Sequence, residues 1–137
     1  MTETRGFLVD SNVLLDIFTR DPEWHDWSSA ALANAARTST VSINPLIFAE
    51  VSASFAHIDE LEAAMPATAL KRIALPYAAA FLAGKAFLAY RRRGGPRRAP
   101  LPDFYIGAHA LVHGLTLITR DPKLYRTYFP TLKLITP

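Results

Sequence analysis

The sequence predicts an α/β fold in which helices flank a mainly parallel central sheet. Short apolar segments that can form buried strands alternate with longer segments whose apolar residues recur every three or four positions. The chain has 137 residues, the length of one ordinary domain, which can bury roughly two thirds of its unfolded surface. Half of the residues are hydrophobic and a fifth are charged, a composition that argues against disorder and against fibrous architectures.

The first two elements are expected to be a strand and a helix. The apolar run Gly6–Val9 ends at Asp10, and either Asp10 or Ser11 can accept a backbone hydrogen bond as the N-cap of a helix. The apolar positions of that helix follow the helical period: Val13, Leu14, Ile17 and Phe18. A break at Arg20–Pro22 then separates it from an alanine-rich helix.

The rest of the chain continues this alternation. Further helices are expected at Trp24–Arg37, Pro45–Ala56, Ile58–Ala64, Tyr77–Arg92, Asp103–His113 and Leu124–Phe129. Further strands are expected at Val41–Ile43, Leu115–Thr119 and Lys133–Ile135. The pattern of Lys71–Leu75 is ambiguous. Strands that alternate with helices form a parallel sheet covered on both faces, and no repeat or linker interrupts the pattern, so we expect a single domain over residues 1–137.

The composition excludes several classes of function. Cysteine is absent, so any metal must be held by oxygen or imidazole ligands. Thr38–Ala49 and Ile73–Gly84 have twelve residues each without charge, and Phe104–Thr119 has sixteen without Asp, Glu, Lys or Arg, whereas a membrane-spanning helix needs about 20 apolar residues. The segment Met1–Asp16 lacks the apolar core and cleavage site of a secretory signal. We therefore expect a cytoplasmic protein that does not cross a membrane.

The charges are divided unevenly between the two halves of the chain. Residues 1–70 contain ten Asp or Glu and three Lys or Arg, whereas residues 71–137 contain two acids and twelve bases. A basic half attracts a polyanion such as nucleic acid, and the two acids within it, Asp103 and Asp121, oppose that attraction unless they neutralise something positive. The alternative is a solvated basic face with two capping acids.

Four carboxylates are expected at one edge of the sheet. Asp10 ends the first strand, Asp121 follows the strand Leu115–Thr119, Asp103 lies in the first turn of a helix, and Glu50 lies in the second turn of another. Ligands of parallel sheets gather at the carboxyl ends of the strands. Carboxylates that lie this close together repel one another unless cations occupy the cluster or some of the carboxylates are protonated. Such hard oxygen ligands select Mg²⁺ or Mn²⁺.

Each acid also has a structural interpretation. Asp10 can cap its helix, Asp103 can stabilise the positive end of its helix, and Asp121 can be a turn residue. Glu50 fits such an interpretation least, because its helix neighbours are apolar and an unpaired carboxylate among them is costly. Asp16 is a weaker fifth candidate, which we interpret as solvated or salt-bridged.

Polar side chains accompany the acids. Asn12 follows Asp10 by two residues and Thr119 precedes Asp121 by two, so both can bind a water molecule or a phosphate oxygen at the site. Ordinary turn and cap hydrogen bonds are the alternative.

A cluster of arginines precedes Asp103 and predicts contact with an RNA backbone. Its members are Arg91, Arg92, Arg93, Arg97 and Arg98. Three aromatic residues are expected to be available for base stacking: Tyr90, Phe104 and Tyr105. Solvated arginines that stabilise a helix C-terminus are the alternative interpretation.

Histidines are not expected to bind zinc. His109 and His113 have a spacing that can chelate the ion, but Asp103 points about 120° away from His109 on the same helix.

Four segments of the chain, taken in order, resemble the motifs of PIN-domain ribonucleases. They are Leu8-Val-Asp10-Ser-Asn12-Val-Leu-Leu-Asp16, Asn44-Pro-Leu-Ile-Phe-Ala-Glu50-Val, Leu101-Pro-Asp103-Phe-Tyr-Ile-Gly-Ala-His-Ala and Leu117-Ile-Thr119-Arg-Asp121. Within that family the chain resembles the VapC toxins of toxin–antitoxin pairs. One such motif is a weak signal, but four in this order and spacing are a strong one.

The resemblance implies a PIN-domain-like three-layer sandwich and an endoribonuclease that depends on Mg²⁺ or Mn²⁺. It implies four catalytic and metal-binding residues: Asp10, Glu50, Asp103 and Asp121. Asn12 and Thr119 are implied as their polar supports. The implied partners are an RNA substrate, a VapB-like antitoxin and a second copy of the chain.

Two other classes of protein remain as alternatives. A phosphotransfer domain of the haloacid-dehalogenase or receiver type also has an Asp after its first strand, but the former requires a second Asp where Asn12 stands and the latter an adjacent acidic pair. A noncatalytic RNA-binding module accounts for the basic half and gives Glu50 no role.

Overall fold

The strands form one parallel sheet, described with the rest of residues 5–65, 70–97 and 101–137 in a computed structural model. In chain order they are β1 (Phe7–Val9), β2 (Val41–Ile43), β3 (Leu70–Arg72), β4 (Thr116–Ile118) and β5 (Leu134–Ile135). The strand order is β3-β2-β1-β4-β5, and every neighbouring pair is parallel. All residues of β1, β2 and β4 are buried, as is typical of central strands in a covered parallel sheet.

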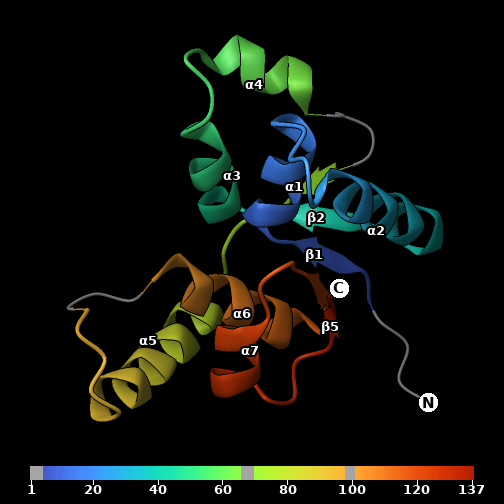
Figure 1. Cartoon of the computed structure of the whole chain (residues 1–137). Coiled ribbons are helices and arrows are strands. Elements are labelled where there is room, and N and C mark those ends of the chain that lie inside the picture. Colours follow the sequence, from blue (N-terminus) through green and yellow to red (C-terminus); the bar gives the residue numbers. More distant parts are fainter. Residues whose placement is uncertain (1–4, 66–69, 98–100) are drawn as a thin grey trace.

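Helices flank this sheet, so the predicted α/β sandwich is confirmed. They are α1 (Ser11–Phe18), α2 (His25–Thr38), α3 (Pro45–Ser52), α4 (Ile58–Ala64), α5 (Tyr77–Arg92), α6 (Pro102–His113) and α7 (Lys123–Tyr128). Figure 1 shows α1 to α4 grouped together and α5, α6 and α7 packed against one another in a second group. Contacts between α3 and α6 join the two groups.

Two segments differ from the sequence prediction. The ambiguous segment Lys71–Leu75 overlaps β3, which pairs with β2 so that Val41 lies beside Leu70. Only Leu70 of this edge strand is buried, so its sequence carries too little apolar signal to identify a strand. The helix predicted over Pro45–Ala56 ends at Ser52, and the chain then turns to pack Phe55 edge-to-face on Phe18 with ring centroids 5.8 Å apart.

A glycine marks the end of α6. Gly114 follows α6 with a φ of +66°, a left-handed conformation that glycine adopts readily. Within the described part of the chain, no helix is both long and apolar enough to span a membrane.

Candidate metal centre

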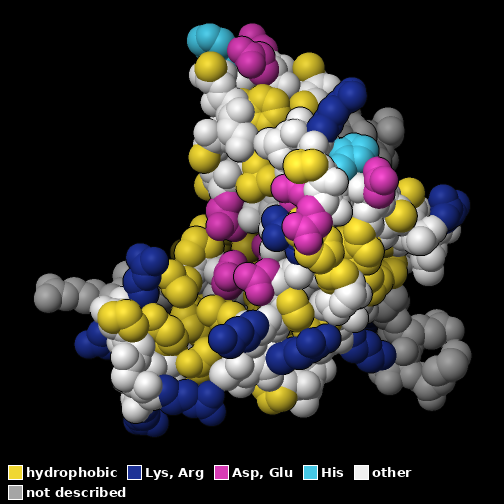
Figure 2. All heavy atoms as spheres, viewed as in Figure 1, with side chains coloured by type: hydrophobic (Ala, Val, Ile, Leu, Met, Phe, Trp, Pro, Cys, Tyr) yellow, Lys and Arg dark blue, Asp and Glu magenta, His cyan; other side chains and the backbone are white. Residues whose placement is uncertain are grey.

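Three acidic side chains, one from the start of α1 and one each from α3 and α6, meet at the edge of the sheet where the carboxyl ends of the strands lie. Asp10 directly follows the central strand β1 and is the N-cap of α1, while α3 and α6 supply Glu50 and Asp103. One carboxylate oxygen from each lies within 4.8 Å of the other two. Figure 2 shows acidic side chains gathered where the two groups of helices meet. Residues far apart in sequence are therefore brought within reach of a single cation.

Asp10 is the most firmly held of the three. It is 2% exposed, and its Oδ1 accepts a hydrogen bond of 2.8 Å from the backbone N–H of Ser11. Its Oδ2 accepts hydrogen bonds from the hydroxyls of Thr119 (2.9 Å) and Tyr125 (2.8 Å). Burial nevertheless raises the pKa of Asp10, because these hydrogen bonds offset only part of the loss of hydration.

The predicted polar supports, Asn12 and Thr119, belong to this network. The amide nitrogen of Asn12 donates to Thr119 Oγ1 at 3.2 Å and to Asp10 Oδ2 at 3.4 Å. Its amide oxygen accepts from the backbone N–H of Arg120 at 3.0 Å, which ties α1 to the segment after β4. Both residues therefore position Asp10.

Tyr125 is a site residue that the sequence analysis missed. It lies on α7, is fully buried, and its hydroxyl contacts the carboxylates of both Asp10 and Asp103. Burial and these two negative charges raise its pKa well above the ordinary value, so the hydroxyl stays protonated and donates. The sequence offers one signal for it: a tyrosine on an apolar helix face needs a partner for its hydroxyl.

Glu50 and Asp103 are half-buried and less constrained. Glu50 Oε1 accepts a hydrogen bond of 3.0 Å from the hydroxyl of Ser11. Burial raises the pKa of Glu50, and the charge of Asp10 raises it further. Burial, followed by the charges of Asp10 and Glu50, raises the pKa of Asp103 to about 6. Within residues 5–65, 70–97 and 101–137, no positive charge offsets the raised pKa values of these three carboxyl groups.

The donor set fits a divalent cation. Three carboxylates supply hard oxygen ligands, which Mg²⁺ and Mn²⁺ prefer. Burial and, to a smaller extent, neighbouring negative charges raise their pKa values, so the cluster is unfavourable as a set of anions, and a cation between them offsets both effects.

Comparison with known proteins identifies the family. The model of the PIN domain matches residues 7–130, which is most of the chain. The chain belongs to the PIN domain family. PIN domains are in general nucleases that use divalent metals, and this membership replaces the alternative of a phosphotransfer domain.

Solved structures share the PIN fold over nearly their whole length. VapBC2 from Rickettsia felis, bound to a DNA fragment from its promoter, matches with a TM-score of 0.74 and 18% identity over 96% of this chain and 98% of that chain. DNA-bound VapBC from Salmonella typhimurium gives a TM-score of 0.71 and 18% identity over 96% of this chain and 97% of that chain. VapBC-1 from nontypeable Haemophilus influenzae gives a TM-score of 0.70 and 16% identity over 95% of this chain and 96% of that chain. A comparison with curated protein sequences found no match.

The fourth predicted acid of this PIN domain, Asp121, lies at the margin of the cluster. It is exposed and is not one of the three residues whose oxygens lie within 4.8 Å of one another. It is still near enough for its charge to raise the pKa values of Asp10 and Asp103. Its backbone N–H donates to Thr119 Oγ1 at 3.2 Å, which links it to the support of Asp10.

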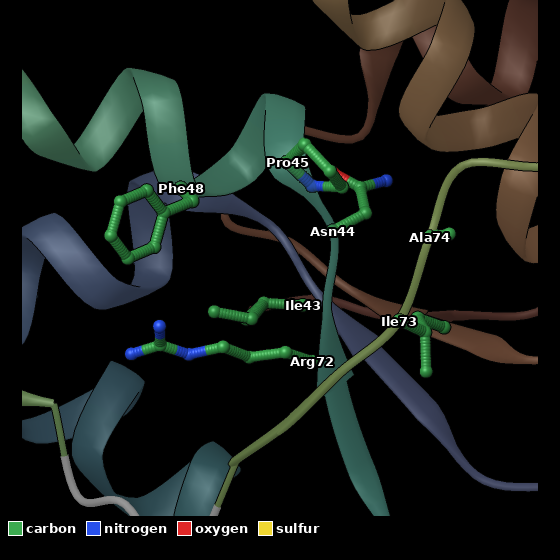
Figure 3. Close-up of a pocket in the computed structure, with 7 residues that line it drawn as sticks. All are labelled: Ile43, Asn44, Pro45, Phe48, Arg72, Ile73 and Ala74. Carbon is green, nitrogen blue, oxygen red and sulfur yellow. The ribbon is translucent and has the colours of Figure 1, made fainter.

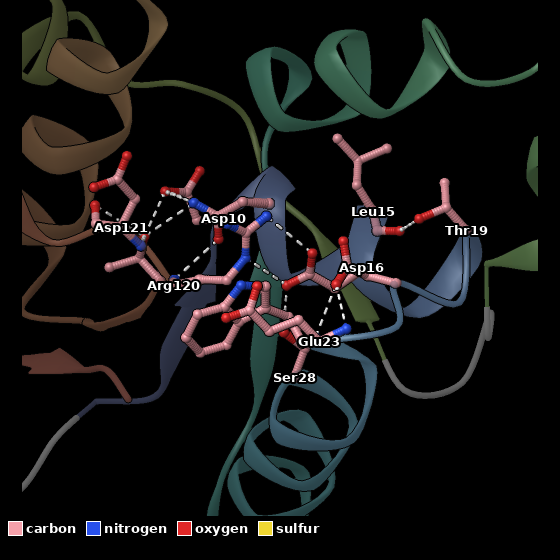
Figure 4. Close-up of polar contacts among 12 residues, drawn as sticks. Asp10, Leu15, Asp16, Thr19, Glu23, Ser28, Arg120 and Asp121 are labelled. Atoms are coloured by element: carbon pink, nitrogen blue, oxygen red, sulfur yellow. Dashed lines mark hydrogen bonds and ion pairs between the residues drawn. The ribbon is translucent and has the colours of Figure 1, made fainter.

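Asp16, the weaker fifth candidate, forms a buried ion pair outside the metal cluster. Arg120 contacts it through two hydrogen bonds of 2.8 and 2.9 Å, and the hydroxyl of Ser28 donates to it at 2.7 Å. Figure 4 shows Arg120 between Asp10 and Asp16, with its guanidinium turned toward Asp16. Asp16 therefore holds α1, α2 and the segment after β4 together, as the salt-bridged interpretation predicted.

The described members of the predicted arginine cluster are exposed at the end of α5 and just after it, but some of them have local roles. Arg91 donates to the carbonyls of Gly95 (3.1 Å) and Arg97 (2.8 Å). The guanidinium of Arg93 lies over the ring of Tyr128 at 5.4 Å. Arg92 and Arg97 are exposed, and Arg98 lies outside the described residues.

The prediction that Phe104 stacks on bases is wrong. Its side chain is fully buried and packs edge-to-face against the rings of Phe87, Tyr90 and Tyr128. The helical period places Phe104 on the core face of α6, directly after the half-buried start of that helix. Tyr90 and Tyr105 are half-buried.

A separate cavity of about 400 Å³ lies beside β2 and β3. Figure 3 shows Phe48 and Arg72 on one side of it and Ile73 and Ala74 on the other. Its lining is mainly apolar, and its charged residue, Arg72, is paired with Glu62 at 2.6 Å. None of the three clustered carboxylates lines this cavity, so we place the chemistry at the acidic cluster.

Proposed function

We propose that this PIN domain is a Mg²⁺- or Mn²⁺-dependent endoribonuclease and acts as the toxin of a VapBC-type toxin–antitoxin pair in the cytoplasm. The convergence of Asp10, Glu50 and Asp103 is the observation that carries this proposal. A noncatalytic module has no use for three repelling carboxylates, because their raised pKa values mark an arrangement that destabilises the protein without a cation.

Asp10, Glu50 and Asp103 would hold the cation, with Asp121 at the margin as a more peripheral acid. A bound divalent cation supplies Lewis-acid polarisation of the phosphodiester and lowers the pKa of a water molecule. Thr119, Asn12 and Tyr125 keep Asp10 in one orientation. Glu50 accepts a hydrogen bond from the Ser11 hydroxyl and is half-buried, and besides holding the cation it would orient the attacking water and accept its proton.

RNA is the proposed polyanion because the basic half of the chain carries exposed arginines close in sequence to Asp103. Arg92 and Arg97 are exposed on the chain segment that leads into α6, the helix that carries Asp103. Phosphate contacts of this kind position a nucleic acid without reading its sequence.

A VapB-like antitoxin and a second copy of the chain are the proposed partners. The fold neighbours were solved as VapBC complexes. The surface of α5 supports self-association: Tyr77 is 94% exposed, Phe81 is 69% exposed, and Leu88 continues the same helical stripe.

Replacing Phe81 by Glu should convert a dimer to a monomer, as measured by the mass in light scattering. An unchanged mass would contradict a dimer formed through α5.

Cleavage of RNA by the purified protein tests the function directly. We expect degradation of total RNA with Mn²⁺ or Mg²⁺ and none after chelation. The Asp10→Asn variant is the control, because a carboxamide cannot replace the carboxylate ligand. Metal-independent RNA binding without cleavage would favour the noncatalytic module, and full activity of Asp10→Asn would contradict the assigned site.

A further inference from the structure

His109 is a buried histidine that the proposed reaction does not use. It lies on α6, is 0% exposed, and its Nδ1 is 3.0 Å from the amide nitrogen of Asn44. Asn44 is the N-cap of α3, where its amide oxygen accepts from the backbone N–H of Ile47 at 2.9 Å. Because that oxygen is committed to the cap, the amide N–H₂ faces the ring. His109 Nδ1 is therefore the acceptor, and the ring hydrogen is on Nε2.

This arrangement leaves a buried donor unpaired. Among the described residues, His109 Nε2 has no hydrogen-bond partner, and a buried N–H without a partner loses its hydration without compensation. Burial and the neighbouring His113 lower the pKa of His109 to about 4, so the ring is neutral and its Nδ1 lone pair is available at neutral pH. An apolar side chain would avoid the unpaired N–H. What the histidine adds is the acceptor for Asn44.

The Asn44–His109 hydrogen bond joins the two helices that carry Glu50 and Asp103. Asn44 lies six residues before Glu50, and His109 lies six residues after Asp103. Six residues of α-helix span about 9 Å, so the bond joins the two helices at points equally distant from the two carboxylates. Metal ligands must be placed within a few tenths of an ångström, so the position of α3 relative to α6 limits how well Glu50 and Asp103 can hold one cation.

We propose that the Asn44–His109 hydrogen bond is a brace that positions Glu50 relative to Asp103 for binding a divalent cation. This inference rests on the proposed function, and it assigns Asn44 and His109 as positioning residues.

Three substitutions separate the brace from the cap and from packing. Asn44→Ser retains an N-cap side chain but is too short to reach His109. His109→Leu fills most of the space of the ring without an acceptor. His109→Asn keeps an acceptor at the position of Nδ1 but leaves a void. His113→Asn, which changes an exposed histidine one turn further along the same helix, is the control.

Binding of Mn²⁺ alone to the full chain, measured by loss of the free-ion electron paramagnetic resonance signal, is the readout. Thermal unfolding is measured on the same samples. We expect Asn44→Ser and His109→Leu to bind Mn²⁺ about tenfold or more weakly, and His109→Asn to stay within about threefold of the wild type. Because of its void, His109→Asn should unfold at a lower temperature than His109→Leu. The order of metal affinity would then be the reverse of the order of stability.

Other outcomes overturn the inference in distinguishable ways. If Asn44→Ser and His109→Leu bind Mn²⁺ as tightly as the wild type, the brace has no positioning role. If affinity follows unfolding temperature, the role of His109 is packing alone. If the wild-type protein binds no Mn²⁺, the proposed function fails and the brace fails with it. Should Asn44→Ser not fold, the His109→Leu and His109→Asn pair still decides the question.

Discussion

At the scale of single residues, the three clustered carboxylates differ in how firmly the protein holds them. Asp10 accepts hydrogen bonds from the side chains of Thr119, Tyr125 and Asn12 and from the backbone of Ser11. Glu50 and Asp103 are held by fewer contacts. Asp10 is therefore part of the structure as well as of the site, whereas the charge of Asp103 is mainly a liability when no cation is bound.

Replacing Asp103 by Asn should remove Mn²⁺ binding and RNA cleavage but stabilise the metal-free protein. The raised pKa of Asp103, about 6, sets the pH window. Between the unfolded value of 3.8 and about 6 the folded wild type binds more protons than the unfolded chain, so its stability falls as pH rises through that range. The gain of Asp103→Asn over the wild type should thus be absent below pH 4 and reach the order of 1–3 kcal/mol above pH 6.

Urea unfolding in chelator at several pH values measures this gain. Asp10→Asn is the matched control. Both oxygens of Asp10 accept hydrogen bonds, so the N–H₂ of an amide would face a donor, and this variant should be less stable than the wild type at neutral pH although the pKa of Asp10 is raised. A gain for Asp103→Asn that does not change between pH 4 and pH 7 would contradict the electrostatic explanation.

Replacing Tyr125 by Phe should weaken the site without removing a ligand. The Tyr125 hydroxyl lowers the pKa values of Asp10 and Asp103 by donating to their charged forms. Its loss should reduce stability by about 1–2 kcal/mol and shift Mn²⁺ binding to higher pH, since protons compete better with the cation. Mn²⁺ titrations between pH 5 and pH 8 measure the shift. Tyr128→Phe, on the same helix, should leave the pH dependence unchanged.

At the scale of elements, the close contact of α6 and α7 delivers Tyr125 to the site. Gly107 of α6 makes this possible, because a Cβ there would lie 2.7 Å from ring carbons of Phe129 and 3.0 Å from a ring carbon of Tyr125. The glycine is thus selected by packing of its neighbour, although glycine is a poor helix former.

Replacing Gly107 by Ala should therefore destabilise the protein by about 1–3 kcal/mol and weaken Mn²⁺ binding, because α7 must move away from α6. Gly84→Ala is the control within α5, where a Cβ would meet no atom within 4 Å. That change should stabilise the protein by about 0.5–1 kcal/mol through helix propensity alone. Thermal unfolding should show a lower unfolding temperature for Gly107→Ala and a higher one for Gly84→Ala. Equal changes in the two variants would show that packing around Gly107 is not the cause.

The elements also show where sequence patterns are sufficient. The helical period and the positions of Asp10, Pro45 and Gly114 identify α1, α3 and α6 at one or both of their ends. The edge strand β3 carries no such pattern, since solvent covers most of its side chains. The early end of α3 follows from the packing of Phe55 on Phe18 of α1, a contact that no local signal encodes.

At the scale of the whole molecule, exposed arginines lie on the segment that leads into α6, the helix that carries Asp103, which suits a polyanion held over a cation. If Arg92 and Arg97 contact RNA phosphates, replacing both by Gln should reduce the slope of log affinity against log salt by about 1.4, or about 0.7 for each phosphate contact to a single strand. Filter binding in chelator, without cleavage, measures the slope. Arg37→Gln, which changes an exposed base in the acidic half, should leave it unchanged. An unchanged slope in the double variant would show that these two arginines do not contact RNA phosphates.

The sequence by itself determined which residues could form a site, because strand ends and helix starts are local features that periodicity and capping residues reveal. Asp10, Glu50 and Asp103 were placed near one edge on that basis. Only the tertiary structure decided which of them touch, that Asp121 lies at the margin, that Tyr125 enters from α7, that Phe104 is buried, and that His109 faces Asn44. These facts depend on contacts between residues far apart in the chain, and such contacts are set by how helices pack rather than by the local preferences of either partner.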